Sequence, residues 1–170
     1  MKKIRYGIVG CGSMGREHIE NLRALPGTEV TAIADPFAGS REQAAALLDG
    51  KVTLFEDHNE LLNSGLVDAV VVASPNFTHV QVMRDAIATD LPILCEKPLG
   101  TRIADGVELI ERERERKKQG RRAMVWVAHE YRYMPPVAEM LKIADAGGIG
   151  TIHQVAIREH REPFYPKVGD

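Results

Sequence analysis

The chain alternates between short, strongly apolar runs and longer segments whose apolar residues recur every three or four positions. The short runs predict β-strands at residues 4–9, 29–34, 52–55, 68–73, 92–95 and 122–128. The longer segments predict helices at residues 16–25, 40–48, 57–64, 77–88 and 102–119, the third of them capped by Asp57. This alternation predicts an α/β fold of the Rossmann type: a doubly wound parallel sheet with helices on both faces.

The regular alternation of predicted strands and helices ends after residue 128. A helix is predicted at 136–146, followed by a strand at 151–159. One strand cannot form a domain, because its edges and one face would lack partners. We therefore expect a dinucleotide-binding domain at 1–128. We expect 129–170 to hold a linker helix and the first strand of an incomplete second α/β domain, which is cut short or pairs with another chain as a homo-oligomer.

The first predicted strand ends at a glycine-rich segment. Gly10, Gly12 and Gly15 follow it in the pattern G-x-G-x-x-G, a helix comes next, and the second strand stops on Asp35. This order is the dinucleotide-binding fingerprint, although the glycines alone are also compatible with a simple turn. A tight turn at the first glycine and close backbone approach at the second would place a pyrophosphate at the helix N-terminus.

Asp35 bears on the choice of cofactor. A carboxylate at the end of the second strand can accept both ribose hydroxyls of an adenosine, and its charge would repel a 2′-phosphate. This favours NAD over NADP. Two alternatives remain open: Asp35 and Pro36 are also typical of a strand-ending turn, and the nearby Arg41 could accommodate a phosphate.

Both cysteines adjoin predicted strand ends. Cys11 lies between two fingerprint glycines, where a reactive thiol is conceivable, but we interpret it as a small side chain beside the pyrophosphate. Cys95 is distant in sequence, so the pair suits a reduced cytoplasmic protein better than a disulfide framework.

Two further segments follow strands, where open α/β sheets bind their ligands. In the first, Asn76 is a candidate helix cap, and His79 either faces the cleft or has a structural role. His18 is expected on a helix surface. In the second, Lys97 precedes Pro98; this lysine could assist proton transfer at a substrate hydroxyl, or it could be a solvent-facing loop residue.

Composition narrows the partners. The chain has 170 residues, 44% of them hydrophobic, and a formal net charge of −2. No basic field points to nucleic acid or a membrane surface, the six histidines have no metal-ligand spacing, and no apolar run has the length of a membrane span or a signal peptide. The charged run at 112–122 is interpreted as a solvated helix end because glutamates alternate through its first half.

The motifs GIVGCGSMG, ASPNFTHV and CEKPLG, together with Asp35, resemble the glucose–fructose oxidoreductase / inositol dehydrogenase (Gfo/Idh/MocA) family. The resemblance implies a Rossmann domain followed by a second domain on a large open sheet, and NAD(P)-linked chemistry on sugars, inositols and related polyols. It implies that Lys97 supports proton transfer, with Glu96 beside it at the substrate and Arg132 near the cofactor. The remaining cofactor-binding positions that it implies are Gly10, Cys11, Gly12, Ser13, Met14, Gly15, Asp35, Ser74, Pro75, Asn76 and His79.

The chain departs from that family in length. Family members are roughly twice as long, and their second domain supplies an aspartate and a histidine that face the lysine. We therefore expect this chain to bind a dinucleotide and to turn over poorly or not at all. The leading interpretation is an NAD-dependent oxidoreductase for a sugar, inositol or related polyol. The alternatives are a non-enzymatic dinucleotide-sensing regulator and an NAD-dependent glycosidase, both of which the family contains.

Overall fold

The computed structural model describes residues 2–121 and 124–160. The chain divides into two compact units, Met1–Ala128 and His129–Asp170. Each unit is described by itself.

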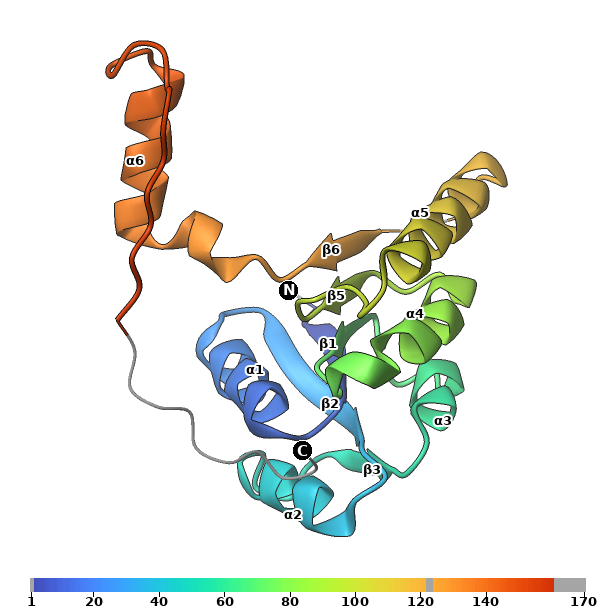
Figure 1. Ribbon diagram of the computed structural model, residues 1–170. Coiled ribbons are helices and arrows are strands. Elements are labelled where there is room, and N and C mark those ends of the chain that lie inside the picture. The colour runs from blue at the N-terminus through green and yellow to red at the C-terminus, as the bar shows by residue number, and fades with distance from the viewer. Residues whose placement is uncertain (1, 122–123, 161–170) are drawn as a thin grey trace. The chain divides into compact units, whose positions relative to one another are not determined.

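The first unit is built on a six-stranded sheet in the order β3-β2-β1-β4-β5-β6 (Figure 1). All of its neighbouring strands run parallel. The strands are β1 (Ile4–Val9), β2 (Thr28–Ala34), β3 (Thr53–Phe55), β4 (Ala69–Val72), β5 (Ile93–Cys95) and β6 (Val125–Val127). The strand order reverses between β1 and β4, and such a reversal opens a ligand crevice at the carboxyl ends of the strands. The predicted Rossmann-type α/β fold is confirmed.

Helices cover both faces of this sheet (Figure 1). They are α1 (Ser13–Ala24), α2 (Ala38–Ala46), α3 (His58–Asn63), α4 (His79–Ala88) and α5 (Ile103–Lys118), with a short 3-10 turn η1 (Asn76–Thr78) before α4. Two apolar clusters show which helices share a face. One contains residues of α1 and α2, and the other contains residues of α3, α4 and α5.

Side chains of the central strands alternate between the two clusters. On β1, Ile8 packs with α1 and α2, whereas its neighbour Val9 packs on the opposite face. On β4, Val71 takes the first face, and Val70 and Val72 take the second, all three being fully buried. A strand buried on both sides needs a continuous apolar run rather than an alternating one. This is why the run around residue 70 has the composition that predicted a central strand.

Several element boundaries differ from the predictions, for local reasons. Helix α1 starts at Ser13 instead of 16, because Gly12 acts as its N-cap and the end of the glycine motif already belongs to the helix. Asp57 caps α3 as predicted, its side chain accepting a hydrogen bond from the Asn59 amide at 2.8 Å. Asn76 does not cap α4: the N-cap position of that helix is Thr78, and Asn76 lies in η1.

In residues 129–160, the described part of the second unit, the structure has a 3-10 turn, η2 (Glu130–Tyr133), and one helix, α6 (Pro135–Asp145). The strand predicted at 151–159 is wrong, since residues 152–160 have no regular secondary structure. A strand requires a hydrogen-bonded neighbour, and none of the strands in the described part of the chain pairs with this segment. No helix in the described ranges is both long and apolar enough to cross a membrane.

Candidate functional site

The ends of the strands lie side by side at the carboxyl edge of the sheet. Parallel pairing places six strand-final residues in register: Phe55, Ala34, Val9, Val72, Cys95 and Val127. The residues that follow continue the pattern, with the Gly10 amide donating to the Ala34 carbonyl and the Glu96 amide to the Val72 carbonyl, both at 2.8 Å. Segments that are far apart in sequence therefore leave the sheet at the same level.

The glycine motif forms a compact turn between β1 and α1. Gly10 has φ of +91°, and a Cβ at this position would overlap the Ser74 backbone on β4's outgoing loop. A Cβ at Gly15 would overlap the Gly10 carbonyl oxygen. Both glycines are needed for the packing of the turn itself.

Gly12 differs from these two glycines, because a Cβ there would meet nothing within 4 Å. It is exposed at the N-cap of α1, a helix without a side-chain cap in the structure. The first amides of a helix lack intrahelical acceptors and favour an anion. Open space in front of uncapped amides, those of Ser13 and Met14 among them, fits the pyrophosphate of a dinucleotide.

Asp35 is tied to both flanking loops. Its side chain is largely buried, with 9% of the residue exposed, and its two oxygens accept one backbone amide each, from Cys11 at 2.7 Å and from Phe37 at 2.9 Å. A carboxylate has about four lone-pair sites, so these bonds leave capacity for ribose hydroxyls. Asp35 thus fits the predicted role and also holds the glycine loop in place.

Arg41 is engaged elsewhere. Its guanidinium donates to the Asp35 main-chain carbonyl at 2.6 Å and pairs with Glu56 at 2.8 Å. A 2′-phosphate would have to compete with this carboxylate for the guanidinium. The arrangement weakens the alternative in which Arg41 accommodates NADP.

The two cysteines are buried thiols. Burial, followed by the charge of Asp35, raises the pKa of Cys11 to about 12; burial, followed by the charge of Glu96, raises the pKa of Cys95 to about 12. The thiolate is the nucleophilic form, so neither side chain is activated at neutral pH. This supports the interpretation of Cys11 as a small packing residue.

The loop after β4 contains three of the predicted cofactor-binding residues. Ser74 accepts a hydrogen bond from the Thr78 hydroxyl at 2.7 Å, and Pro75 and Asn76 are exposed at the edge of the sheet. His79 is placed differently. Its side chain is fully buried, with Nδ1 2.7 Å from the Pro98 carbonyl oxygen and Nε2 2.8 Å from the Ser74 carbonyl oxygen.

The loop after β5 presents Lys97. The lysine is exposed, and no residue in the described ranges forms a hydrogen bond or ion pair with its ammonium. Glu96 beside it is buried, and the Lys97–Pro98 peptide is cis. The structure thus presents a free amine next to a buried acid, at the level where the other strands end.

Sequence reasoning missed His18. Placed on α1 and expected on its surface, it is only 17% exposed, and its Nε2 lies 3.0 Å from Glu96 Oε1. Burial favours a raised pKa for Glu96, but the hydrogen bond and charge of His18 and the Lys97 amide outweigh it and lower that pKa. No local pattern signals this pair, because its partners are 78 residues apart in the chain, with β2 to β5 between them.

Arg132 lies on η2 in the second unit, where its side chain is exposed. Its predicted place near the cofactor stays a prediction. In the described part of the chain, no group of three or more histidine, cysteine or acidic side chains is arranged to hold a metal ion.

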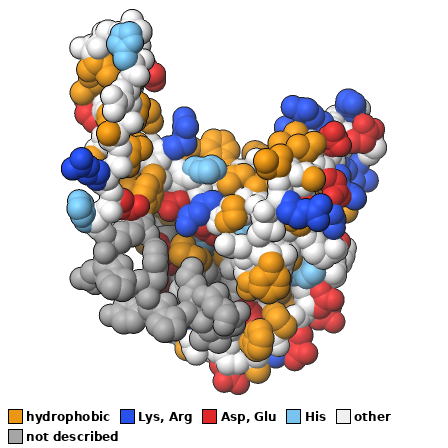
Figure 2. All heavy atoms as spheres, in the orientation of Figure 1, with side chains coloured by type: hydrophobic (Ala, Val, Ile, Leu, Met, Phe, Trp, Pro, Cys, Tyr) orange, Lys and Arg blue, Asp and Glu red, His pale blue; other side chains and the backbone are white. Residues whose placement is uncertain are grey.

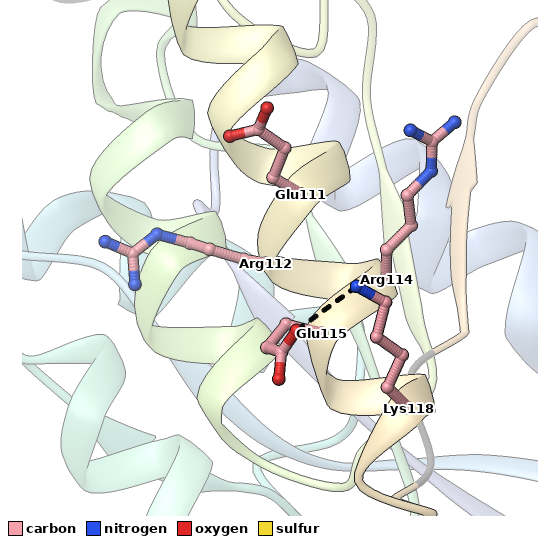
Figure 3. Close-up of a pocket in the computed structure, with 5 residues that line it drawn as sticks. All are labelled: Glu111, Arg112, Arg114, Glu115 and Lys118. Carbon is pink, nitrogen blue, oxygen red and sulfur yellow. Dashed lines mark ion pairs between the residues drawn. The ribbon is translucent and has the colours of Figure 1, made fainter.

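A hollow of about 450 Å³ lies along the last turns of α5 (Figure 3). Its lining comes from one helix and has alternating charges: Glu111, Arg112, Arg114, Glu115 and Lys118. Figure 2 shows basic and acidic side chains interspersed over this helix. Helix α5 leads from the carboxyl end of β5 back to the start of β6, so these turns lie at the opposite end of the sheet from the glycine loop. The hollow therefore lies on the charged helix end that the sequence predicts to face solvent.

The fold and the glycine turn define a dinucleotide-binding protein of the Rossmann class. A family model described as "Oxidoreductase family, NAD-binding Rossmann fold" (GFO_IDH_MocA) matches residues 4–125, and the chain belongs to this family. The family resemblance seen in the motifs is thereby confirmed, and so is the NAD-binding type of the fold.

Known proteins agree with this assignment. The chain is 36% identical over 167 residues to inositol 2-dehydrogenase 2 of Saccharopolyspora erythraea, covering 96% of this chain and 47% of that protein. It is 35% identical over 148 residues to inositol 2-dehydrogenase 1 of the same organism, covering 86% and 43%. The crystal structure of Lactobacillus casei myo-inositol dehydrogenase in complex with NAD(H) and myo-inositol superimposes with a TM-score of 0.80 at 29% identity, covering 87% of this chain and 43% of that one. The chain thus spans just under half the length of these relatives.

Proposed function

We propose that this chain binds NAD at the carboxyl edge of its sheet and forms the cofactor side of an oxidoreductase. The reaction would transfer a hydride between nicotinamide and a hydroxyl-bearing carbon of an inositol, a sugar or a related polyol. One observation carries the proposal: in-register strand ends bring the glycine turn, Asp35 and Lys97 to one edge. The inositol dehydrogenases that the chain resembles support the substrate class.

The glycine half of the edge would hold the cofactor. Uncapped amides at the start of α1 attract the pyrophosphate, and the open position at Gly12 lets it approach. Asp35 accepts the adenosine ribose hydroxyls through lone pairs that its two backbone bonds leave available. Its negative charge repels a 2′-phosphate, so NAD is preferred to NADP.

The reacting end would lie beside the loops after β4 and β5. Bound NAD supplies the hydride acceptor or donor. The neutral amine of Lys97 takes the proton of the substrate hydroxyl as that hydroxyl becomes a carbonyl, and the ammonium so formed returns the proton in the reverse direction. Exposure of its amine leaves it free to reach a substrate.

The other functions considered from the sequence gain no support. Retention of Lys97 argues against a purely regulatory protein. Nothing in the described site favours glycoside hydrolysis, and the inositol dehydrogenases matched are oxidoreductases by name. Assembly through residues 129–170 and a cytoplasmic location remain predictions.

Titration of NADH and NADPH by calorimetry tests the cofactor site. We expect this chain to bind NADH at least about tenfold more tightly than NADPH, since one charge repulsion in a partly buried site is worth roughly 1–2 kcal/mol. Asp35→Asn should weaken NADH binding and narrow that ratio, because the amide removes the charge.

The matched control is Asp49→Asn, an exposed residue in the turn after α2 with φ of +52°, a conformation that asparagine also tolerates. It should leave both affinities unchanged. A folded chain that binds neither dinucleotide would refute the proposed function, and tighter binding of NADPH would refute the role of Asp35.

A further inference from the structure

The two residues that flank Lys97 are each held by a histidine from a different helix. On one side, His18 of α1 lies 3.0 Å from Glu96 Oε1, and the other oxygen of Glu96 accepts the Lys97 amide at 3.2 Å. On the other side, His79 of α4 lies 2.7 Å from the Pro98 carbonyl oxygen. Lys97 and Pro98 are exposed, but Glu96 is buried and the Pro98 carbonyl contacts a buried histidine.

The His79 contacts are unusual for a buried imidazole, because both of its ring nitrogens face carbonyl oxygens. A carbonyl oxygen only accepts, so each contact is a hydrogen bond when that nitrogen carries the ring proton. Through these contacts His79 joins the Ser74 turn after β4 to the Pro98 turn after β5. A fully buried polar ring in this position links two loops of the site rather than contacting a ligand.

His18 adds a link to the glycine loop. It lies on the second turn of α1, the helix whose first amides face the open position at Gly12. A displacement of α1 would therefore also displace Glu96, and through Glu96 it would displace the Lys97 amide. This connects the place proposed for the pyrophosphate with the place proposed for proton transfer.

We propose that His18 and His79 are positioning residues that hold Lys97 from both sides, each through one of its neighbours in the chain. We call these two histidine contacts the clamp. The importance of the clamp for catalysis rests on the proposed function of Lys97, but the existence of the clamp does not. Neither histidine reaches the reacting atoms. Each acts through a bond to the 96–98 segment, and removal of that bond frees the lysine.

Substitution of each histidine by asparagine or glutamine can either keep or remove its hydrogen bond to Glu96 or Pro98. The amide nitrogen of glutamine occupies a position comparable to Nε2 of histidine, and that of asparagine a position comparable to Nδ1. The bond to Glu96 uses Nε2 of His18, so His18→Gln keeps a donor there and His18→Asn loses it. The bond to Pro98 uses Nδ1 of His79, so His79→Asn keeps a donor and His79→Gln loses it.

The readout is hydrogen exchange of the Lys97 amide, measured by NMR on the full chain without cofactor, with the Val71 amide in β4 as internal reference. His18→Asn and His79→Gln should each accelerate exchange at Lys97 by about tenfold or more, as expected when one partner of a buried polar pair is lost. His18→Gln and His79→Asn should stay within about twofold of the parent chain. The matched control is His58→Asn, which removes the Nε2 bond of a histidine to Asp85 between α3 and α4 and should leave Lys97 unchanged.

The crossed pattern separates the clamp from general destabilisation. Asparagine is the poorer helix former, so an effect of helix stability alone would make asparagine worse at both positions. That outcome, or equal exchange in all four variants, overturns the clamp. NADH titration of the same proteins reports separately on the proposed function: a parent chain that binds no NADH defeats that function, while the exchange pattern still decides whether the histidines hold the segment.

Discussion

The two halves of the carboxyl edge are held together by different means. In the glycine half, glycines pack closely against main chain, and the Asp35 carboxylate joins the loops after β1 and β2 by accepting the Cys11 and Phe37 amides. In the histidine half, His79 of α4 joins the loops after β4 and β5, and His18 of α1 bonds Glu96 after β5. The first half rests on close backbone packing, and the second half depends on helices being correctly docked.

The comparison teaches which half tolerates change. A tightly packed backbone turn is disrupted when a Cβ is added, because the neighbouring main-chain atoms cannot shift without a large energetic cost. A side-chain bond can be replaced by another donor of the same reach. We therefore expect substitutions in the glycine half to disrupt the fold and suitable substitutions in the histidine half to be tolerated. Three predictions follow, in addition to the two experiments above.

The largest effect is expected at Gly10. Gly10→Ala combines a φ of +91° with overlap of the Ser74 backbone, so it should cost about 3 kcal/mol or more of unfolding free energy and abolish NADH binding. Gly12→Ala is the matched control, since its Cβ meets nothing within 4 Å. It should unfold like the parent in urea but bind NADH more weakly. Equal stability of both variants would contradict the backbone-built description.

An intermediate effect on stability is expected on acidification, at the contact between α4 and α5. Arg84 of α4 and Arg112 both bond Glu108 of α5, and these hydrogen bonds lower the pKa of Glu108 to about 2. Because the folded-state pKa lies below the ordinary 4.5, Glu108 stabilises the fold above pH 4.5, and this contribution is lost as the pH falls towards 2.

Unfolding midpoints across this pH range measure the effect. Glu108→Gln should lower the midpoint at pH 7, and its difference from the parent should shrink below pH 4.5 and vanish near pH 2. Glu115→Gln, on the exposed end of the same helix, should show little difference at any pH. A Glu108→Gln difference that does not change with pH would show that the carboxylate is not the source of the stability.

The last effect is expected at the cysteines, one in each half, and it changes a reaction rate and not the stability of the fold. With pKa values of about 12, Cys11 and Cys95 should react with a disulfide reagent at pH 8 at least roughly a thousandfold more slowly than a free thiol. Unfolding in urea should restore the ordinary rate for both. Fast labelling of Cys11 alone in the native chain would revive the reactive-thiol interpretation and show that the glycine half opens.

Much of this arrangement could be predicted from the chain. The apolar runs identified the strands, the motif at Gly10 to Gly15 identified the cofactor turn, and Asp57 was recognised as a cap. Each of these signals is local, because strand composition, positive φ and capping depend on a few neighbouring residues. Asn76 was misassigned as a cap because a 3-10 turn intervenes before α4, and local sequence does not distinguish that turn from a first helical turn.

The sequence by itself determined the Rossmann order of elements, the glycine turn and the presence of an acid and a lysine after strand ends. Only the tertiary structure decided that His18 meets Glu96, that His79 is buried between two carbonyls, and that residues 152–160 have no strand partner in the described chain. The physical reason is the sequence distance over which each interaction acts. Turns and strands are specified by steric and apolar preferences of adjacent residues, whereas hydrogen bonds between loops exist only after a sheet has brought distant segments to the same level.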